Sequence, residues 1–275
     1  MIDLHCHSFY SDGELSPSEL LVKASAAGLK LFALTDHDTI SGLAELQQAA
    51  QLCDITIING VELSVRWKKN DIHIIGLNIS VCHEGLAQLL DQQTQNRVIR
   101  ARLIGERFAT VGIAKAYEKA SLIAGHERVG RVHYAQLLIQ EGYVADMKSA
   151  FKRYLGRGRP AYIPTPWVDM EEAVIQIVSA GGDAVIAHPF KYSLTRSKLI
   201  DLIKAFKNAG GRGIEIISGM MTNQEISELV RLSTSFDLLA STGSDFHGDG
   251  VSRVRLGQQQ SLPPNCKPIW HQWTI

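Results

Sequence analysis

The sequence predicts an α/β protein in which a parallel sheet or barrel is interrupted by a helical insertion. Short apolar runs alternate with amphipathic segments before residue 83 and again after residue 160, which is the rhythm of successive strand and helix units. Residues 84–157 instead show only helical spacing of apolar residues. Six of the ten histidines stand at the ends of predicted strands, where α/β sheets and barrels place their active sites.

The part before the insertion begins with a predicted strand at 2–4. A helix follows, because Ser16 suits the N-cap, Pro17 the first helical position and Glu19 the return contact of a capping box. Gly28 marks the end of this helix. The other elements of this part are a strand at 31–34, a helix at about 40–52, and apolar runs rich in β-branched residues at 55–58 and 72–77.

The insertion at 84–157 separates two parts of one predicted barrel domain, residues 1–83 and 158–275. Its apolar residues follow helical spacing, as in Leu86, Leu89 and Leu90. It is also locally basic, which usually indicates a solvated helix surface. After it, the sequence predicts helices at about 170–179, 198–209 and 223–233 and strands at 184–187, 213–217 and 238–241.

Composition narrows the class of protein. A chain of 275 residues can bury a sizeable core without disulfides. Lys plus Arg and Asp plus Glu both total 28, so charge alone does not hold the protein on duplex nucleic acid or a membrane. The four cysteines form no paired motif, and no signal peptide or apolar run of about 18 residues is evident. We therefore expect a reduced, cytoplasmic protein without a membrane partner.

Histidines and carboxylates form the candidate site. Residues i and i+2 of a strand face the same side, so His5 and His7 can point into one cavity, as can Asp245 and His247. A lone histidine is more often a core residue than a ligand, but several strand ends would each have to bury an ionisable group toward one cavity, which is costly without a metal. The candidate ligands are His5, His7, Asp12, His37, Glu62, His73, His188, Asp245 and His247.

Imidazoles and carboxylates together suit Zn²⁺, Mn²⁺ or Fe²⁺. No paired thiolates stand nearby in the sequence, which favours a catalytic site over a structural zinc site. Nine ligands are too many for one ion that keeps positions open for water and substrate, and they suit two or three ions.

These motifs resemble, in their order, those of the PHP (polymerase and histidinol phosphatase) family, and within it the TrpH-like branch. The resemblance spans most of the chain and also includes motifs of the insertion and its end, such as Arg131-Val132-His133-Tyr134-Ala135 and Gly158-Arg159-Pro160-Ala161-Tyr162. The strand-end motifs that carry it are Asp3-Leu4-His5-Cys6-His7-Ser8, Ser11-Asp12-Gly13, Thr35-Asp36-His37-Asp38, Gly60-Val61-Glu62, His73-Ile74-Ile75-Gly76, Ala187-His188-Pro189 and Gly243-Ser244-Asp245-Phe246-His247.

The resemblance implies a distorted (β/α)₇ barrel with three divalent metal ions, most often Mn²⁺, with Fe²⁺, Zn²⁺ or Mg²⁺ as alternatives. Members of this branch are nucleoside 3′,5′-bisphosphate phosphatases and 5′-to-3′ exoribonucleases acting on short RNA. Carried over by motif, the first ion is held by His5, His7, Glu62 and Asp245, the second by Glu62, His73 and His188, and the third by Asp12, His37 and His247.

We therefore predict a metal-dependent phosphoesterase in which a metal-bridging hydroxide attacks phosphorus in line. Asp36 and Asp38 are expected to orient ligating imidazoles from behind. The predicted catalytic residues are Glu62, Asp245, His247 and Arg131, and the predicted substrate contacts are Arg128, Arg131, His133 and Lys191.

The insertion is expected to act as a substrate cap over the metal site, because it leaves after the His73 strand and returns before the His188 strand. Arg159 lies nearby, and Tyr134 or Tyr162 can stack on a base. A nucleotide or short single-stranded RNA is then the partner, and no stable protein partner is evident. A purely structural cap is the alternative.

Three other functions stay open at this point. An amidohydrolase also starts with an HxH pair on a barrel strand, although an amide does not obviously need the third metal site of Asp12 and His37. A histidinol-phosphate-type or other small-molecule phosphatase is the alternative within the same chemistry. A nucleic-acid-binding module with an inert metal site is the alternative of another class, and the intact ligand set weakens it.

Overall fold

The chain forms two units in the computed structural model, which describes residues 1–51, 53–126 and 129–273. The barrel unit comprises Met1–Leu90 and Val168–Ile275, and the helical unit comprises Asp91–Trp167. The two boundaries lie in α3 (Glu84–Thr110) and before β5 (Val168–Asp169). The predicted division at 84 and 157, and the role of a cap, stay predictions.

The barrel unit is built on a mixed sheet whose strands follow the order β1-β2-β3-β4-β6-β7-β8, with β5 paired to β3. The two ends of this order come together, because the N–H of Leu4 donates to the carbonyl of Thr242 and Cys6 bridges to Phe246. The α/β class and the distorted barrel are thus confirmed. The strands other than β5 are β1 (Ile2–Asp3), β2 (Leu31–Leu34), β3 (Thr56–Trp67), β4 (Asn70–Leu77), β6 (Asp183–Ile186), β7 (Gly213–Ser218) and β8 (Leu239–Gly243).

The expectation of a parallel sheet is wrong for β4. This strand pairs antiparallel with both β3 and β6, whereas the other pairs are parallel. The cause is the short turn between Trp67 and Asn70, since a two-residue connection can join only antiparallel strands. Lys68 takes the positive φ that such a turn requires. As a result β3 runs much further than the predicted run at 55–58 and carries Glu62 in its interior.

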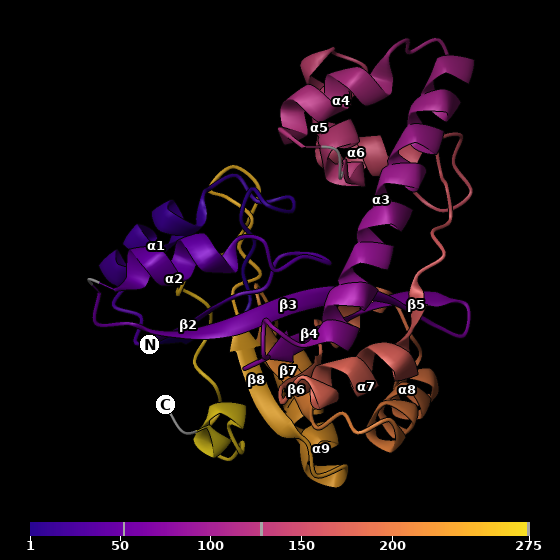
Figure 1. Cartoon of the computed structure of the whole chain (residues 1–275). Coiled ribbons are helices and arrows are strands. Elements are labelled where there is room, and N and C mark those ends of the chain that lie inside the picture. Colours follow the sequence, from indigo (N-terminus) through magenta and orange to yellow (C-terminus); the bar gives the residue numbers. More distant parts are fainter. Residues whose placement is uncertain (52, 127–128, 274–275) are drawn as a thin grey trace. The chain divides into compact units, whose positions relative to one another are not determined.

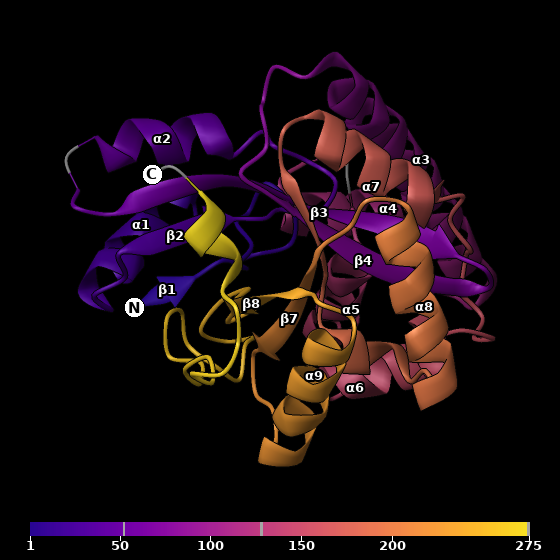
Figure 2. The ribbon, with the colours of Figure 1, turned by 90° about the horizontal axis from the view of Figure 1, so that it is seen from below.

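Helices cover the outside of the barrel unit. The start of α1 (Pro17–Ala26) is confirmed: the Ser16 hydroxyl accepts from the N–H of Glu19, whose carboxylate accepts from the N–H of Ser16. Figures 1 and 2 show α1 and α2 (Leu43–Ala50) together near β2, and α7 packs against β3, β4 and β6 while α9 packs against β7. These later helices are α7 (Met170–Ser179), α8 (Arg196–Asn208) and α9 (Asn223–Ser235).

Tight packing at the meeting of β1 and β8 positions the site. A Cβ atom on Gly243 would stand only 2.2 Å from the Cβ of His5, so only glycine lets the end of β8 approach the residues after β1 this closely. Leu4 lies in one apolar core with Val185 and Ile269, while Cys6 and Phe246 lie together in another. His5, which stands between Leu4 and Cys6 in the sequence, is therefore flanked by two residues that are anchored in different apolar cores.

The helical unit has an apolar core of its own. It contains most of α3, together with α4 (Ala116–Ala124), α5 (Arg131–Gln140), α6 (Met147–Ala150) and a π-helical turn at Phe151–Leu155. Tyr134 is fully buried in this core, where its ring stacks on Phe108 and its hydroxyl donates to the carbonyl of Ala101. Within the described part of the chain, no helix has the length and apolarity needed to cross a bilayer.

Candidate metal centre

The nine predicted ligands all meet at one rim of the barrel unit. His5 and His7 follow β1, His37 follows β2, and Glu62 and His73 lie within β3 and β4. His188 follows β6, Asp245 and His247 follow β8, and Asp12 lies in the loop before α1. The N–H of Asp245 donates to the carbonyl of His5, and the N–H of His7 donates to the carbonyl of Phe246. The ends of β1 and β8 therefore present their ligands side by side.

The first group joins His5, His7, Glu62 and Asp245, and is almost completely buried. His5 Nε2 and His7 Nε2 are 3.1 Å apart. Glu62 Oε2 lies 3.4 Å from His5 Nε2 and 3.3 Å from His7 Nε2, and Asp245 Oδ1 lies 3.4 Å from each of them. Four donor atoms at bonds of about 2.1 Å from one ion stand about 3.0–3.4 Å apart, depending on geometry. The spacing of this group is that of a metal coordination shell.

The second group is centred on Oε1 of Glu62, the other oxygen of the carboxylate that takes part in the first group. Glu62 Oε1 lies 2.9 Å from His73 Nδ1 and 2.9 Å from His188 Nε2. Glu62 itself is fully buried. Its two oxygens therefore face two different groups of imidazoles, as required of a ligand that bridges two ions.

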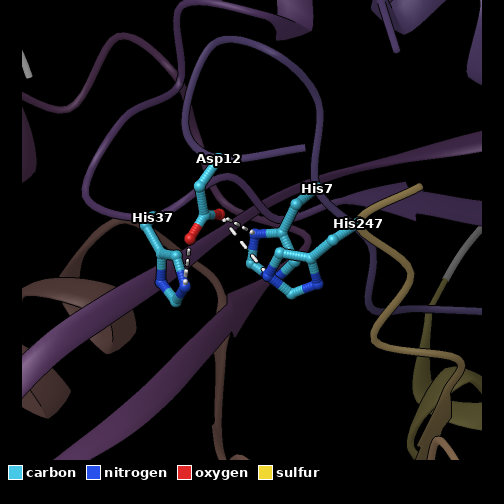
Figure 3. Close-up of side chains that lie close together, drawn as sticks. All are labelled: His7, Asp12, His37 and His247. Carbon is cyan, nitrogen blue, oxygen red and sulfur yellow. Dashed lines mark ion pairs between the residues drawn. The ribbon is translucent and has the colours of Figure 1, made fainter. Parts of the chain in front are cut away.

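The third group joins Asp12, His37 and His247, and Figure 3 shows their side chains converging with that of His7. Asp12 Oδ1 lies 3.4 Å from His247 Nε2, and Asp12 Oδ2 lies 3.9 Å from His37 Nε2. These distances are longer than in the first two groups. Its side chains are more open than those of the first group, with 12% to 17% of their surface exposed.

Two further observations indicate that the groups suit divalent metal ions. Among the described residues, Glu62 Oε2, the oxygen that faces His5 and His7, is buried without a properly oriented hydrogen-bond partner, and such an atom is costly unless something binds it. The donor set is nitrogen and oxygen, while the thiol of Cys6 donates to the carbonyl of Ala33 on the apolar side. Nitrogen and oxygen donors suit divalent ions of borderline or hard character.

The electrostatics of the metal-free groups follow from burial and mutual pairing. Burial disfavours the charged form of His5, but Glu215, Glu62 and Asp245 outweigh it and raise its pKa well above the usual value. Burial also disfavours the charged form of His7, but its interactions with Asp245 and Glu62 outweigh this effect and raise its pKa to about 9. Burial lowers the pKa of His37 to about 4. Without metal, the first group therefore holds protons that a bound ion would have to displace.

The carboxylates of the centre stay ionised. Burial works against the charged form of Glu62, but His37, His73 and His5 hold its pKa well below the usual range. His37 and His247 do the same for Asp12, and His5 and Lys191 for Asp245, in each case against the effect of burial. The centre thus offers three anionic ligands at neutral pH.

Asp36 and Asp38 are hydrogen-bonded to backbone groups and serine hydroxyls beside the ligands. Asp36 accepts hydrogen bonds from the N–H and hydroxyl of Ser8 and from the hydroxyl of Ser11, so it fixes the loop that carries Asp12. Asp38 accepts from the N–H of Ser64, so it anchors β3 beside Glu62. These hydrogen bonds position backbone and loop segments, and the support of imidazoles by Asp36 and Asp38 stays a prediction.

A buried acid that the prediction missed supports the first group. Glu215 Oε1 lies 2.8 Å from His5 Nδ1, and Glu215 Oε2 accepts from the backbone N–H of His188 at 2.6 Å. Glu215 lies within β7 and is fully buried. Its signal in the sequence is a carboxylate in the middle of an apolar strand, which is costly unless a partner is present.

The predicted substrate contacts are spread over both units. In the barrel unit, Lys191 follows His188 and its ammonium contacts Asp245 Oδ2. In the helical unit, the guanidinium of Arg131 lies 5.5 Å from the ring centre of Tyr162, and His133 Nδ1 accepts from the N–H of Gly130 at the start of α5. Arg128 lies outside the described residues. Tyr134 cannot stack on a base as predicted, because it is buried in the core of the helical unit.

Comparisons with known proteins agree with this geometry. The PHP domain model matches residues 3–259. A 3′,5′-nucleoside bisphosphate phosphatase of Chromobacterium violaceum is 41% identical over 98% of this chain and 95% of its own length. A 5′-3′ exoribonuclease of Haemophilus influenzae is 42% identical over 98% of both chains.

Solved structures share the fold of this chain. An amidohydrolase from Chromobacterium violaceum, solved with bound sulfate and no metal, superposes with a TM-score of 0.94 at 41% identity, over 98% of this chain and 94% of that one. A putative metal-dependent phosphoesterase from Bifidobacterium adolescentis superposes with a TM-score of 0.80 at 25% identity, over 98% and 92%. Fold and site together define a metal-dependent phosphoesterase. The chain belongs to the PHP domain family.

Proposed function

We propose that the protein hydrolyses phosphate esters of nucleotides, namely nucleoside 3′,5′-bisphosphates and the 5′ ends of short RNA, with three divalent ions, most readily Mn²⁺. The observation that carries the proposal is the double group around Glu62, whose two oxygens lie 2.9–3.4 Å from imidazole nitrogens on either side. The full-length similarity to a bisphosphate phosphatase and an exoribonuclease supports the substrate class.

His5, His7, Glu62 and Asp245 would hold the first ion, Glu62, His73 and His188 the second, and Asp12, His37 and His247 the third. A neutral imidazole offers a lone pair at only one nitrogen. Because His7 Nε2 faces the first group, its Nδ1, 4.0 Å from Asp12 Oδ1, carries the proton. His7 therefore lies against the third group without being one of its ligands.

When bound, such ions neutralise phosphate charge, hold its non-bridging oxygens and activate water as the nucleophile. The protein adds Lys191, whose pKa Asp245 raises against the effect of burial, so that it stays charged. Its side chain is 54% exposed while its ammonium touches a carboxylate of the first group. Lys191 is thus able to bind a substrate phosphate from the solvent side and stabilise the charge that develops there.

The helical unit is proposed to choose the substrate. The chain enters it after β4, which carries His73, and leaves it before β6, which precedes His188. Arg131 and Tyr162 already associate as a cation and an aromatic ring, a pair that suits phosphate binding and base stacking. His133 and Arg159 are further candidates.

A substrate panel tests the proposal. Metal-depleted protein reloaded with Mn²⁺ is assayed with adenosine 3′,5′-bisphosphate, 5′-phosphorylated and 5′-hydroxyl oligoribonucleotides, histidinol phosphate, p-nitrophenyl phosphate and a simple amide. We expect metal-dependent release of phosphate or nucleotide from the bisphosphate or the 5′-phosphorylated RNA. Asp245→Asn, purified in the same way, should be inactive and so exclude a contaminating phosphatase. Preference for the amide would favour an amidohydrolase, and inactivity throughout would favour an inert binding module.

A further inference from the structure

We infer that Glu215 is a positioning residue that orients one ligand of the first metal-binding group and one ligand of the second. This role rests on the proposed metal-dependent function. Glu215 touches no atom of either group that would face an ion. It reaches His5 at Nδ1, on the side of the ring away from the other ligands, and His188 at its backbone N–H. One buried carboxylate therefore contacts a ligand residue of each group.

The contact with His5 fixes which ring nitrogen is available to an ion. A carboxylate only accepts hydrogen bonds, so His5 Nδ1, at 2.8 Å, must carry a proton. The lone pair of the neutral ring then lies on Nε2, which is the atom 3.1–3.4 Å from His7, Glu62 and Asp245. Such an outer carboxylate also makes the imidazole a better ligand.

The contact with His188 holds a strained piece of backbone. His188 has φ 25° and ψ 61°, a conformation that is unfavourable for a residue with a Cβ and persists only when its surroundings enforce it. The hydrogen bond from its N–H to Glu215 Oε2 is 2.6 Å long. We conclude that this bond keeps the turn after β6 in the shape that directs His188 Nε2 to Glu62.

Glu215 is the last residue of a regular stretch of sheet, in which Gly213, Ile214 and Glu215 pair in register with Leu239, Ala240 and Ser241. The pairing of β7 with β8 shifts register between Glu215 and Ile217. A bulge of this kind redirects side chains and is common beside active sites. Here Ile214, Ile216 and Ile217 all enter the apolar core, while Glu215 alone faces the ligands. The alternation of a regular strand thus turns Glu215 toward the ligands, and the bulge that follows lets Ile216 and Ile217 both pack in the apolar core.

Glu215→Gln separates positioning from simple packing, because glutamine keeps the size but offers one acceptor and one donor. If its oxygen accepts from His188 N–H, its amide group faces His5 Nδ1, which must then accept, and the ring proton moves to Nε2. If it turns round, two donors face each other at His188. Either way one metal-binding group is damaged. A merely structural carboxylate would tolerate the exchange.

Asp3→Asn is the matched control. Asp3 is an equally buried carboxylate in the same region, but its hydrogen bonds come from the backbone N–H groups of His5, Ser244 and Gly257 and from the Ser244 side chain rather than from an imidazole. Its amide variant should therefore lower the melting temperature without changing the ring proton of His5 or the number of bound ions.

The experiment measures metal affinity by competition with a chelator, together with nitrogen NMR of histidine-labelled, Zn²⁺-loaded protein. In the wild type we expect His5 to carry its proton on Nδ1. In Glu215→Gln we expect a loss of affinity of about 10- to 100-fold and either a changed His5 resonance or a weakened His188 amide, seen as faster hydrogen exchange.

Affinity within threefold of wild type, with both signals unchanged, would overturn the inference. If Glu215→Gln does not fold, the wild-type spectrum still decides, since a proton on His5 Nε2 or a fast-exchanging His188 amide is incompatible with it. Failure of the proposed function is a separate outcome, because the wild type itself would then neither bind the ions nor hydrolyse phosphate esters.

Discussion

Replacing Glu62 with glutamine is the sharpest test of the double metal-binding group. The change keeps shape but removes the negative charge that both groups share. In the structure, Glu62 Oε2 lies 2.9 Å from His37 Nδ1 as well as near His5 and His7, and Oε1 lies near His73 and His188. A single substitution should therefore weaken two ions at once, whereas loss of any other ligand should weaken one.

The size of the effect follows from what outer partners contribute. Loss of a residue that only orients a ligand lowers metal affinity about 10- to 100-fold, so loss of a direct ligand should exceed about 100-fold for each ion, or about 2.8 kcal/mol. At Mn²⁺ concentrations that fill the wild type, elemental analysis should find two fewer ions per chain in Glu62→Gln, and hydrolysis should be lost.

The matched control is Glu228→Gln, which makes the same chemical change on α9, where Glu228 pairs with Arg196 and Arg231. It should keep its metal content and activity. Thermal unfolding shows whether each variant is folded. An unchanged metal content in folded Glu62→Gln, or the loss of only one ion, would refute the bridging role.

Three other outcomes are expected. Asp12→Ala should lose one ion, the most weakly held, because its group is the most widely spaced; anomalous diffraction that finds only two ions in Mn²⁺-saturated wild type would contradict this. Arg131→Ala should lower kcat/KM for a 3′,5′-bisphosphate much more than for p-nitrophenyl phosphate, whereas Arg107→Ala, an exposed control in the same unit, should affect neither; equal loss on both substrates would remove the reading role. Metal affinity should rise about tenfold per pH unit for each proton displaced between pH 7 and about 9, because His7 is protonated up to about pH 9 without metal. Because the folded state raises the pKa of His7, protonated His7 should stabilise the metal-free protein fully below its ordinary pKa, and this stabilisation should be lost as pH rises through about 9. Chelator titrations at several pH values check the metal affinity, and melting curves check the stability.

Most of the candidate ligands were predictable from the sequence because they stand in short motifs at the ends of parallel strands, which meet at a common rim, whereas Asp12 lies in a loop and Glu62 and His73 lie within strands. His5 and His7 needed only the two-residue period of a strand. Glu62 was harder, since the predicted strand stopped at 58 while β3 continues to Trp67 as half of a hairpin. Its local motif was informative although its strand was misjudged.

The supporting residues were not predictable in this way. Asp36 stands beside His37 in the sequence, yet its hydrogen bonds go to Ser8 and Ser11. Glu215 stands far from every ligand in the sequence, and it reaches His5 because it pairs with Ser241 on β8, the strand that meets the residues after β1. Tyr134 was predicted to be able to stack on a base, but it packs in the core of the helical unit. Such partners depend on packing between distant segments, which a linear pattern does not record.

The meeting of β1 with β8 also constrains when the metal centre can form. His5 and Ser244 are 239 positions apart and lie against each other, so the first group is incomplete until nearly the whole chain has left the ribosome. Closing a loop of this length costs about 5 kcal/mol of chain entropy. An ion held by His5, His7 and Asp245 would cross-link the two ends of that loop. Metal binding would then complete folding. Removal of the metal by a chelator would first separate β1 from β8, while the hairpin of β3 and β4 stays paired.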